Sequence, residues 1–199
     1  DPSSGRVEMP FAALADNQVW ALVEAPEGGM WIGTANGLFH GHDGRLENLS
    51  DSLLQGRRTG TFWDLDRDPD GGVWASTRLG LYRLEKTNLV SITKTNGLPD
   101  QHIWSSTRTS DGVIWMGTDT YGLLGYDGHA VTVLDARDGM IGNQAFAVKA
   151  DTDGSLWVGT LDGGLTRYRR GKSAPGIRLR GVKVEDETLG DFSRRPRVP

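Results

Sequence analysis

The segment DRDPDGG at 66–72 holds the side chains best spaced for metal chemistry. Positions one, three, five and six of a calcium-binding loop, in which carboxylate oxygens hold the ion, are matched by Asp66, Asp68, Asp70 and Gly71. The acid that should close such a loop at position twelve is replaced by Thr77, and the flanking sequences are typical of strands rather than helices. We therefore interpret the segment as a hairpin turn and expect no metal and no cofactor.

The remaining reactive side chains do not form a catalytic set. Histidines stand at 40, 42, 102 and 129, and no carboxylate recurs beside them, so we expect surface histidines. The sequence contains no cysteine and no G-x-S-x-G motif for a nucleophile. Acids are paired in the Asp-Gly turns, but every acid pair that we find belongs to a repeated motif explained by turn chemistry. We therefore expect no enzyme activity.

The composition narrows the classes of partner. The 199 residues carry a formal net charge of −4, which argues against nucleic acid because nucleic-acid-binding domains usually present a basic face. The longest apolar runs have four or five residues, whereas a membrane helix needs about 20. The N-terminus also lacks the basic-then-apolar pattern of a signal peptide. We expect contact with a membrane only through segments outside this chain.

Internal repetition is the strongest signal in the sequence. Four tryptophans are separated by 43, 41 and 42 residues, and each is followed by a threonine three positions later. A Gly-Leu pair comes next, and another aromatic residue lies eleven positions before each tryptophan. In chain order the marks are Trp31, Trp74, Trp115 and Trp157; Thr34, Thr77, Thr118 and Thr160; and Trp20, Trp63, Trp104 and Phe146.

Each repeat predicts a set of short antiparallel strands. The run VWALVEA and its copies FWDLDRD, IWSSTRT and AFAVKAD are rich in aromatic and β-branched residues, which favours a strand. An Asp-Gly or Glu-Gly pair then precedes each tryptophan and indicates a hairpin. The run that contains the tryptophan is the second strand. Two further strand-like runs follow it in the first three repeats, and one follows it in the fourth. Four antiparallel strands in roughly 42 residues are typical of a blade. We predict an all-β fold of four β-propeller blades, part of a larger propeller or completed by oligomerisation.

The segments DGSLWVGTLDGGL at 153–165 and NGLPDQHIW at 96–104 resemble the two-component regulator propeller repeat. The resemblance extends over roughly residues 5–172. It implies an extracytoplasmic, periplasmic sensor region of a membrane-bound receptor, of the histidine kinase, hybrid two-component or diguanylate cyclase type. It also implies that a small Tyr-rich β-sandwich follows the last blade.

The register of the repeats suggests domain boundaries. We assign residues 1–172 to about four blades, with residues 5–10 as an outer strand of a preceding or closing blade. The last blade lacks its own outer strand after Tyr168, and the N-terminal strand can supply it in a four-bladed monomer or a two-chain eight-bladed assembly. Residues 173–199 are expected to hold a linker and the start of the β-sandwich, with PGIRLRGVKVED at 175–186 as its first strand.

Ligand-binding residues are expected where loops depart from the repeat. In a propeller of this strand order, the loops between the second and third strands share one face with the loops that lead into each first strand. The departures on that face are Asn36, Arg78, Tyr121 and Asp162 in the first set and Arg58, His102 and Gln144 in the second. The tryptophans Trp31, Trp74, Trp115 and Trp157 are instead assigned to packing between blades.

These observations favour a ligand-sensing propeller without catalytic activity in two-component or cyclic-di-GMP signalling. Its partner would be a small molecule, a glycan or a protein, and a homo-oligomer is compatible with the unpaired outer edge. Two alternatives stay open at this point. One is a propeller-type enzyme acting on polysaccharide, and the other is a pure protein-interaction scaffold.

Overall fold

The four predicted repeats form four antiparallel sheets in the computed structural model of the chain. The structure describes residues 11–14, 17–50, 60–68, 70–84, 89–161, 164–169 and 180–183, without the side chains of Leu89 and 180–183. Blade 1 contains β1 (Val19–Glu24), β2 (Met30–Thr34), β3 (Gly37–His42) and β4 (Arg45–Asn48). Blade 2 contains β5 (Phe62–Arg67), β6 (Val73–Thr77), β7 (Gly80–Leu84) and β8 (Leu89–Ile92).

The second half of the chain repeats this plan with differences at its outer edge. Blade 3 contains β9 (Ile103–Arg108), β10 (Ile114–Thr118), β11 (Leu123–Tyr126) and β12 (Ala130–Leu134). Blade 4 contains β13 (Ala145–Ala150), β14 (Leu156–Thr160) and β15 (Gly164–Tyr168). Within the described residues blade 4 has three strands. Residues 170–179 lie outside the described residues, so the predicted lack of an outer strand after Tyr168 stays a prediction.

A fifth strand, β16 (Arg180–Lys183), pairs antiparallel with β12 at the outer edge of blade 3. It lies in the segment that the sequence assigned to the opening of a β-sandwich. The rest of 173–199 and the N-terminal residues 5–10 lie outside the described residues. The β-sandwich and the N-terminal outer strand therefore stay predictions.

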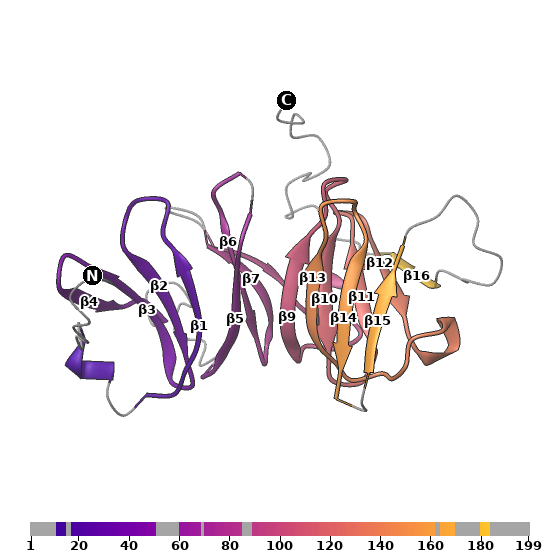
Figure 1. The fold of residues 1–199 in the computed structure, drawn as a ribbon, viewed down its shortest axis with the longest axis horizontal. Coiled ribbons are helices and arrows are strands. Elements are labelled where there is room, and N and C mark those ends of the chain that lie inside the picture. Colours follow the sequence, from indigo (N-terminus) through magenta and orange to yellow (C-terminus); the bar gives the residue numbers. More distant parts are fainter. Residues whose placement is uncertain are drawn as a thin grey trace, which may run out of the picture.

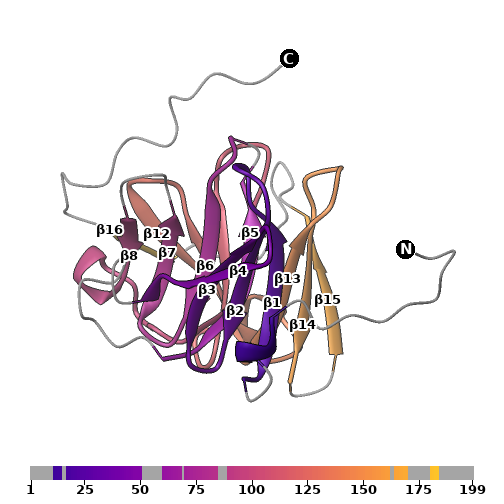
Figure 2. The ribbon, with the colours of Figure 1, turned by 90° about the vertical axis from the view of Figure 1, so that its left-hand side faces the viewer.

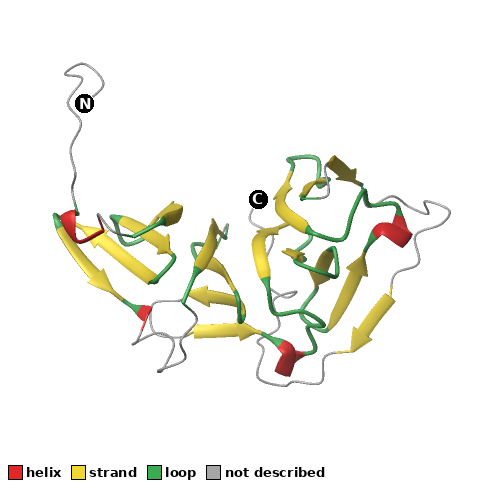
Figure 3. Cartoon of the chain, turned by 90° about the horizontal axis from the view of Figure 1, so that it is seen from below, coloured by secondary structure: helices red, strands yellow, loops and turns green. Residues whose placement is uncertain are grey.

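The blades follow one another along an open arc, with blade 1 at one end and blade 4 at the other (Figure 1). The first strands β1, β5, β9 and β13 contact one another in sequence, while β8, β12 and β16 lie on the opposite side (Figure 2). Seen from below, the arc does not close (Figure 3). The described residues therefore form consecutive propeller blades rather than a closed four-bladed ring.

Two short 3-10 segments lead the chain from one blade into the next. The segments η2 (Lys94–Asn96) and η3 (Ala136–Asp138) each end at a glycine in the left-handed region, Gly97 with φ 89° and Gly139 with φ 97°. Glycine adopts this conformation without steric cost. This geometry explains the glycine in the segment NGLPDQHIW, which leads into the first strand of blade 3. A third 3-10 segment, η1 (Ala12–Leu14), precedes blade 1.

The hydrophobic core is divided into three clusters, one at each interface between consecutive blades. On the second strand, Trp115 packs toward blade 4, whereas its neighbours Ile114 and Met116 pack toward blade 2. Blade 2 repeats the pattern, with Trp74 in the cluster shared with blade 3. Alternate side chains of a strand point to opposite faces of the sheet, so each blade needs a neighbour on both faces.

The four repeated tryptophans therefore occupy different environments. Trp74 and Trp115 are buried, with exposed fractions of 1% and 4%, and Trp31 is half-buried. Trp157 is 37% exposed because its face of blade 4 is not covered by described residues. Trp74 and Trp115 thus pack between blades, each against a following blade that the structure describes.

This difference predicts unequal stability effects for the same substitution. Trp115→Ala should lower the free energy of unfolding by about 3–5 kcal/mol, since it leaves a cavity between blades 3 and 4. Trp157→Ala should lower it by no more than about 2 kcal/mol, because much of that ring is already in water. Urea denaturation of both variants measures the difference. Equal losses would contradict the assignment of the Trp157 face as open.

Candidate functional site

The repeated threonine at the end of each second strand shapes the loops of one face. Thr34 Oγ1 donates to the Gly37 carbonyl over 2.9 Å, and it also accepts from the Asn36 N–H over 3.1 Å. The same bonds recur at Thr77 and Thr118. The threonines are therefore structural, and they hold the loop that follows each second strand in a fixed conformation.

Hydrogen bonds between loops confirm that the two predicted loop sets share this face. Asn36 donates from Nδ2 to Oδ1 of Asn17 over 2.9 Å, which joins the β2–β3 loop to the residues before β1. In blade 3, Thr120 donates to Asp100 over 3.0 Å, which joins the β10–β11 loop to the residues before β9. We call the surface formed by these loops the loop face.

The loop face brings two predicted residues from different blades into direct contact. Arg78 of blade 2 donates from Nε to Nε2 of His102, which precedes the first strand of blade 3, over 3.0 Å. An arginine side chain can only donate, so Nε2 accepts and the ring proton lies on Nδ1. Nδ1 in turn faces Oδ2 of Asp119 at 4.0 Å. The result is a row of three groups, in which the exposed Arg78 guanidinium and the half-exposed Asp119 carboxylate lie on either side of the His102 imidazole.

Two other predicted residues lie in loops of the same face. Tyr121 is 44% exposed, and its N–H is fixed by Thr118. Gln144 contributes its carbonyl to the Leu161 N–H, which anchors the β14–β15 turn. Arg58 and Asp162 lie outside the described residues.

A continuous row of aromatic rings follows the first strands. The ring centroids are 5.3 Å apart for Trp20 and Trp63, 4.8 Å for Trp63 and Trp104, and 5.0 Å for Trp104 and Phe146. His102 lies edge-on to Trp104, with centroids 6.2 Å apart. The aromatic row therefore adjoins the Arg78–His102 pair. The repeat places the four aromatic residues at equivalent positions of their blades. Whether their rings touch depends on how closely the first strands pack.

Two acids on β5 correct a sequence-based expectation. Asp64 and Asp66 have no acidic counterparts in the other first strands, so the expectation that every acid pair belongs to a repeated motif was wrong. Comparison of FWDLDRD with its three copies reveals the departure. Asp64 accepts a hydrogen bond from the Ser106 N–H over 3.1 Å, and Asp66 pairs with Lys149 of blade 4 at 2.6 Å.

The hydrogen bond of Asp64 is one of the contacts that join the first strands of neighbouring blades. Ser105, at the same position of the next blade, accepts from the Val148 N–H over 2.9 Å. Both side chains thus receive the backbone N–H of the following first strand. Asp64, Asp66, Ser105 and Lys149 also line a hollow of about 420 Å³ that extends to Trp157 and Leu165 of blade 4. Burial raises the pKa of the Asp64 carboxyl, and the nearby Asp66 carboxylate adds to this effect.

The segment that resembled a calcium loop forms a buried ion cluster at the opposite end of blade 2. Asp68 is fully buried and accepts from Trp74 Nε1 over 3.0 Å and from Arg108 Nη1 of blade 3 over 2.9 Å. Asp70 is hydrogen-bonded to Arg83, whose guanidinium lies over the Trp74 ring. Because arginines neutralise both carboxylates, the hairpin interpretation is consistent with the structure. No group of three metal-ligating side chains is present in the described ranges.

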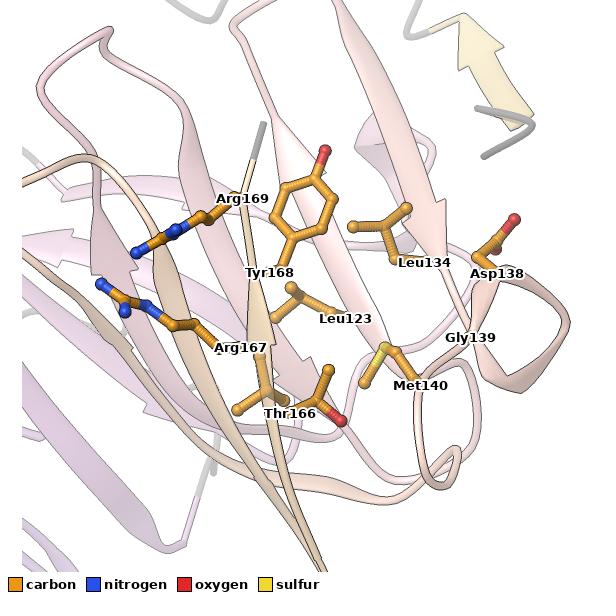
Figure 4. Close-up of a pocket in the computed structure, with 10 residues that line it drawn as sticks. Leu123, Leu134, Asp138, Gly139, Met140, Thr166, Arg167, Tyr168 and Arg169 are labelled. Atoms are coloured by element: carbon orange, nitrogen blue, oxygen red, sulfur yellow. The ribbon is translucent and has the colours of Figure 1, made fainter. Parts of the chain in front are cut away.

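A second hollow, of about 240 Å³, lies between blade 3 and the edge of β15. Figure 4 shows Leu123, Leu134, Met140 and Tyr168 on one side of this strand, with Arg167 and Arg169 pointing to the other. In the other blades a fourth strand pairs with the corresponding edge. We interpret this apolar hollow as packing space for an outer strand rather than as a ligand site.

Two stretches of the chain match the sequence profile of the two component regulator propeller, at residues 13–36 and 97–120. Each stretch spans the first two strands of a blade, in blade 1 and blade 3. The match supports the predicted resemblance for these two repeats. No curated protein sequence matches the chain.

Solved structures share the arrangement of the blades. The extracellular domain of a putative hybrid two component system from B. thetaiotaomicron is 23% identical, with a TM-score of 0.67 over 76% of this chain and 22% of that one. The extracellular domain of a putative one component system from the same organism is 21% identical, with a TM-score of 0.61 over 75% and 21%. This chain therefore spans about a fifth of the length of either domain.

A catalytically inactive virginiamycin B lyase from Staphylococcus aureus, in a structure with quinupristin, is also similar. It is 18% identical, with a TM-score of 0.52 over 81% of this chain and 58% of the lyase chain. At such identities the likeness shows the fold alone. The chain is therefore a run of β-propeller blades. Among the described residues, no helix is long and apolar enough to cross a membrane.

The raised pKa of Asp64 predicts a pH dependence of stability. The folded state binds this proton more tightly than the unfolded state, in which the pKa is near 3.8. Its contribution is therefore complete below that value and is lost as the pH rises through the raised pKa. Urea denaturation from about pH 3 to about pH 7 should show wild type losing stability relative to Asp64→Asn, which keeps an oxygen for the Ser106 N–H. Parallel curves for the two proteins would refute the effect.

Proposed function

We propose that this chain is part of the extracytoplasmic, ligand-sensing propeller of a membrane-bound signal-transduction receptor and has no catalytic activity itself. The receptor would be of the two-component or cyclic-di-GMP type, with its sensor in the periplasm and its membrane segments outside this chain. The matched repeats and the fold shared with extracellular domains of two component and one component systems support this proposal.

The observation that carries the proposal is the contrast between the two ends of the blades. At the end opposite the loop face, the turns keep the same Asp-Gly or Glu-Gly pair in all four repeats. On the loop face, the corresponding positions differ from blade to blade and include the Arg78–His102 pair beside the aromatic row. Variation on a constant scaffold is typical of a binding surface.

The chemistry of the loop face suits a polar ligand with flat or ring-shaped parts. Exposed Trp20 and Phe146 offer apolar ring surface, while Arg78 and Asp119 offer opposite charges and Asn36 offers an amide. Such a combination fits a glycan or another small polar molecule. A ligand that bridges blades 2 and 3 would favour one arrangement of the propeller and so bias an output domain across the membrane.

Asp64 and Asp66 favour one alternative, an enzyme that acts on polysaccharide. They are non-repeated acids beside a hollow, and the pKa of Asp64 is raised, as it often is for catalytic acids. Both carboxylates already serve in the fold, since Asp64 receives the Ser106 N–H and Asp66 pairs with Lys149. A structural role therefore accounts for them without catalysis. Binding to a protein but to no glycan or metabolite would favour the scaffold alternative.

Substitutions on the loop face test the sensor proposal. On a glycan and metabolite panel, Arg78→Ala should weaken binding to any ligand of the wild-type chain at least tenfold, because it removes a charged donor. Its free energy of unfolding should stay within about 0.5 kcal/mol of wild type, since the side chain is at the surface. Isothermal titration calorimetry and urea denaturation measure the two effects.

Arg67→Ala is the matched control for this test. Arg67 is an exposed arginine at the other end of a first strand, so its loss changes the net charge equally without touching the loop face. It should leave ligand binding unchanged. If Arg67→Ala weakens binding as much as Arg78→Ala does, the ligand responds to overall charge and the loop-face proposal fails.

A further inference from the structure

The outward face of blade 4 shares a tryptophan and a leucine with the buried face of blade 2, but it is exposed. Leu81 is fully buried against blade 3, whereas its counterpart Leu165 is 61% exposed. Trp157 and the end of the aromatic row at Phe146 are open in the same way. These residues belong to the face that blades 1, 2 and 3 each use to contact the blade that follows.

The charged cluster of blade 2 also recurs in blade 4, with one side open. Asp151 accepts from Trp157 Nε1 and from Arg167 Nη2, both at 3.1 Å, as Asp68 accepts from Trp74 and lies beside Arg83. Asp68 additionally receives Arg108 from the first strand of the following blade. Hydrogen bonds, first from the Trp157 indole, hold the pKa of Asp151 below its usual value, so it is anionic at neutral pH.

At two of the three joints between blades, the residues at this contact change together. Where blade 3 has Thr109 in place of the aspartate, the first strand of blade 4 has Ala150 in place of the arginine. The joint between blades 1 and 2 differs, because Ala25 stands at the aspartate position while the following strand keeps Arg67, which pairs with Glu24 at 3.9 Å. The one buried aspartate that is covered by a described following blade thus receives an arginine from it.

A glycine on β14 gives independent evidence for a close neighbour. A Cβ at Gly33 would lie 3.1 Å from the Phe62 carbonyl oxygen, and one at Gly117 would lie 2.6 Å from that of Ala145. In both cases the first strand of the following blade approaches closely. Blade 2 has Ser76 at this position, fully buried with its hydroxyl bonded to Ser106 of the following first strand, so the position admits only a small residue. At Gly159, the equivalent position, a Cβ would meet only the Ala147 Cβ at 3.7 Å. Nothing described in this chain requires a small residue there, but a following first strand would.

We propose that the open face of blade 4 binds the first strand of a further propeller blade. That strand carries an aromatic residue against Phe146 and, four residues later, an arginine that reaches Asp151. The arginine completes the charged cluster as Arg108 does in blade 2, and the backbone passes against Gly159. The spacing of four is that between Trp104 and Arg108.

This chemistry disfavours a second copy of this chain as the occupant. Its blade 1 would present Trp20 at the aromatic position but Glu24 at the position of Arg108. Glu24 lies 3.9 Å from Arg67 of its own chain, but its side chain is still 80% exposed, so a second copy would bring its carboxylate against Asp151. Like charges at such a contact oppose association.

The same comparison provides a test on the intact chain. Glu24→Arg supplies the missing arginine on a second copy, so it should make head-to-tail self-association at least tenfold tighter than in wild type. Sedimentation equilibrium over a range of concentrations measures the change. Glu47→Arg, an equal change of charge on exposed β4, should leave association at the wild-type level.

Two second-site changes show whether association uses the proposed contacts. Asp151→Asn and Gly159→Val, each added to Glu24→Arg, should return association to the wild-type level, and melting temperatures would verify that each protein is folded. The proposal is overturned if Glu24→Arg associates no more tightly than wild type, or if either second change leaves its association intact. Wild-type self-association as tight as that of Glu24→Arg would identify a second copy as the occupant instead.

Discussion

The packing of each sheet against its neighbouring blades, on both faces in blades 2 and 3, is the constraint on which this structure depends. Trp74 points toward the following blade while Val73 and Ala75 point toward the preceding one, so both faces of blade 2 contribute to the hydrophobic core. Burying both faces removes much apolar surface from water, which is the main favourable contribution to folding. The chain therefore has three clusters between sheets in place of one central core.

The packing of the blades against one another also positions the side chains of the candidate site. First strands lie close enough for Asp64 and Ser105 to receive backbone N–H groups of the following strand, and this spacing brings the aromatic rings within about 5 Å of one another. Because the strands are fixed, the loops at their ends are fixed too, and Arg78 of one blade meets His102 of the next. A binding surface can then vary in the loops without disturbing the scaffold.

Charge adds specificity to an interface that is otherwise apolar. The hairpin aspartates of blade 2 satisfy the Trp74 indole within the blade and also receive Arg108 from blade 3. Buried ion pairs contribute little net stability, because desolvation offsets their attraction. They penalise a wrong neighbour strongly, however, since an uncompensated buried charge is costly. The Asp68–Arg108 contact thus favours the matched pair of blades 2 and 3 over a mismatched neighbour.

The sequence by itself determined the strands, the turns and the repeat, because tryptophan spacing, Asp-Gly pairs and alternating apolar residues act over a few neighbouring positions. It also identified Arg78 and His102 as departures from the repeat. It did not reveal that they touch, that Asp64 joins two blades, or that Trp157 is open while Trp74 is buried. Those properties depend on which blade lies beside which, and only the tertiary structure decides this, because similar strand sequences acquire different surroundings along the arc.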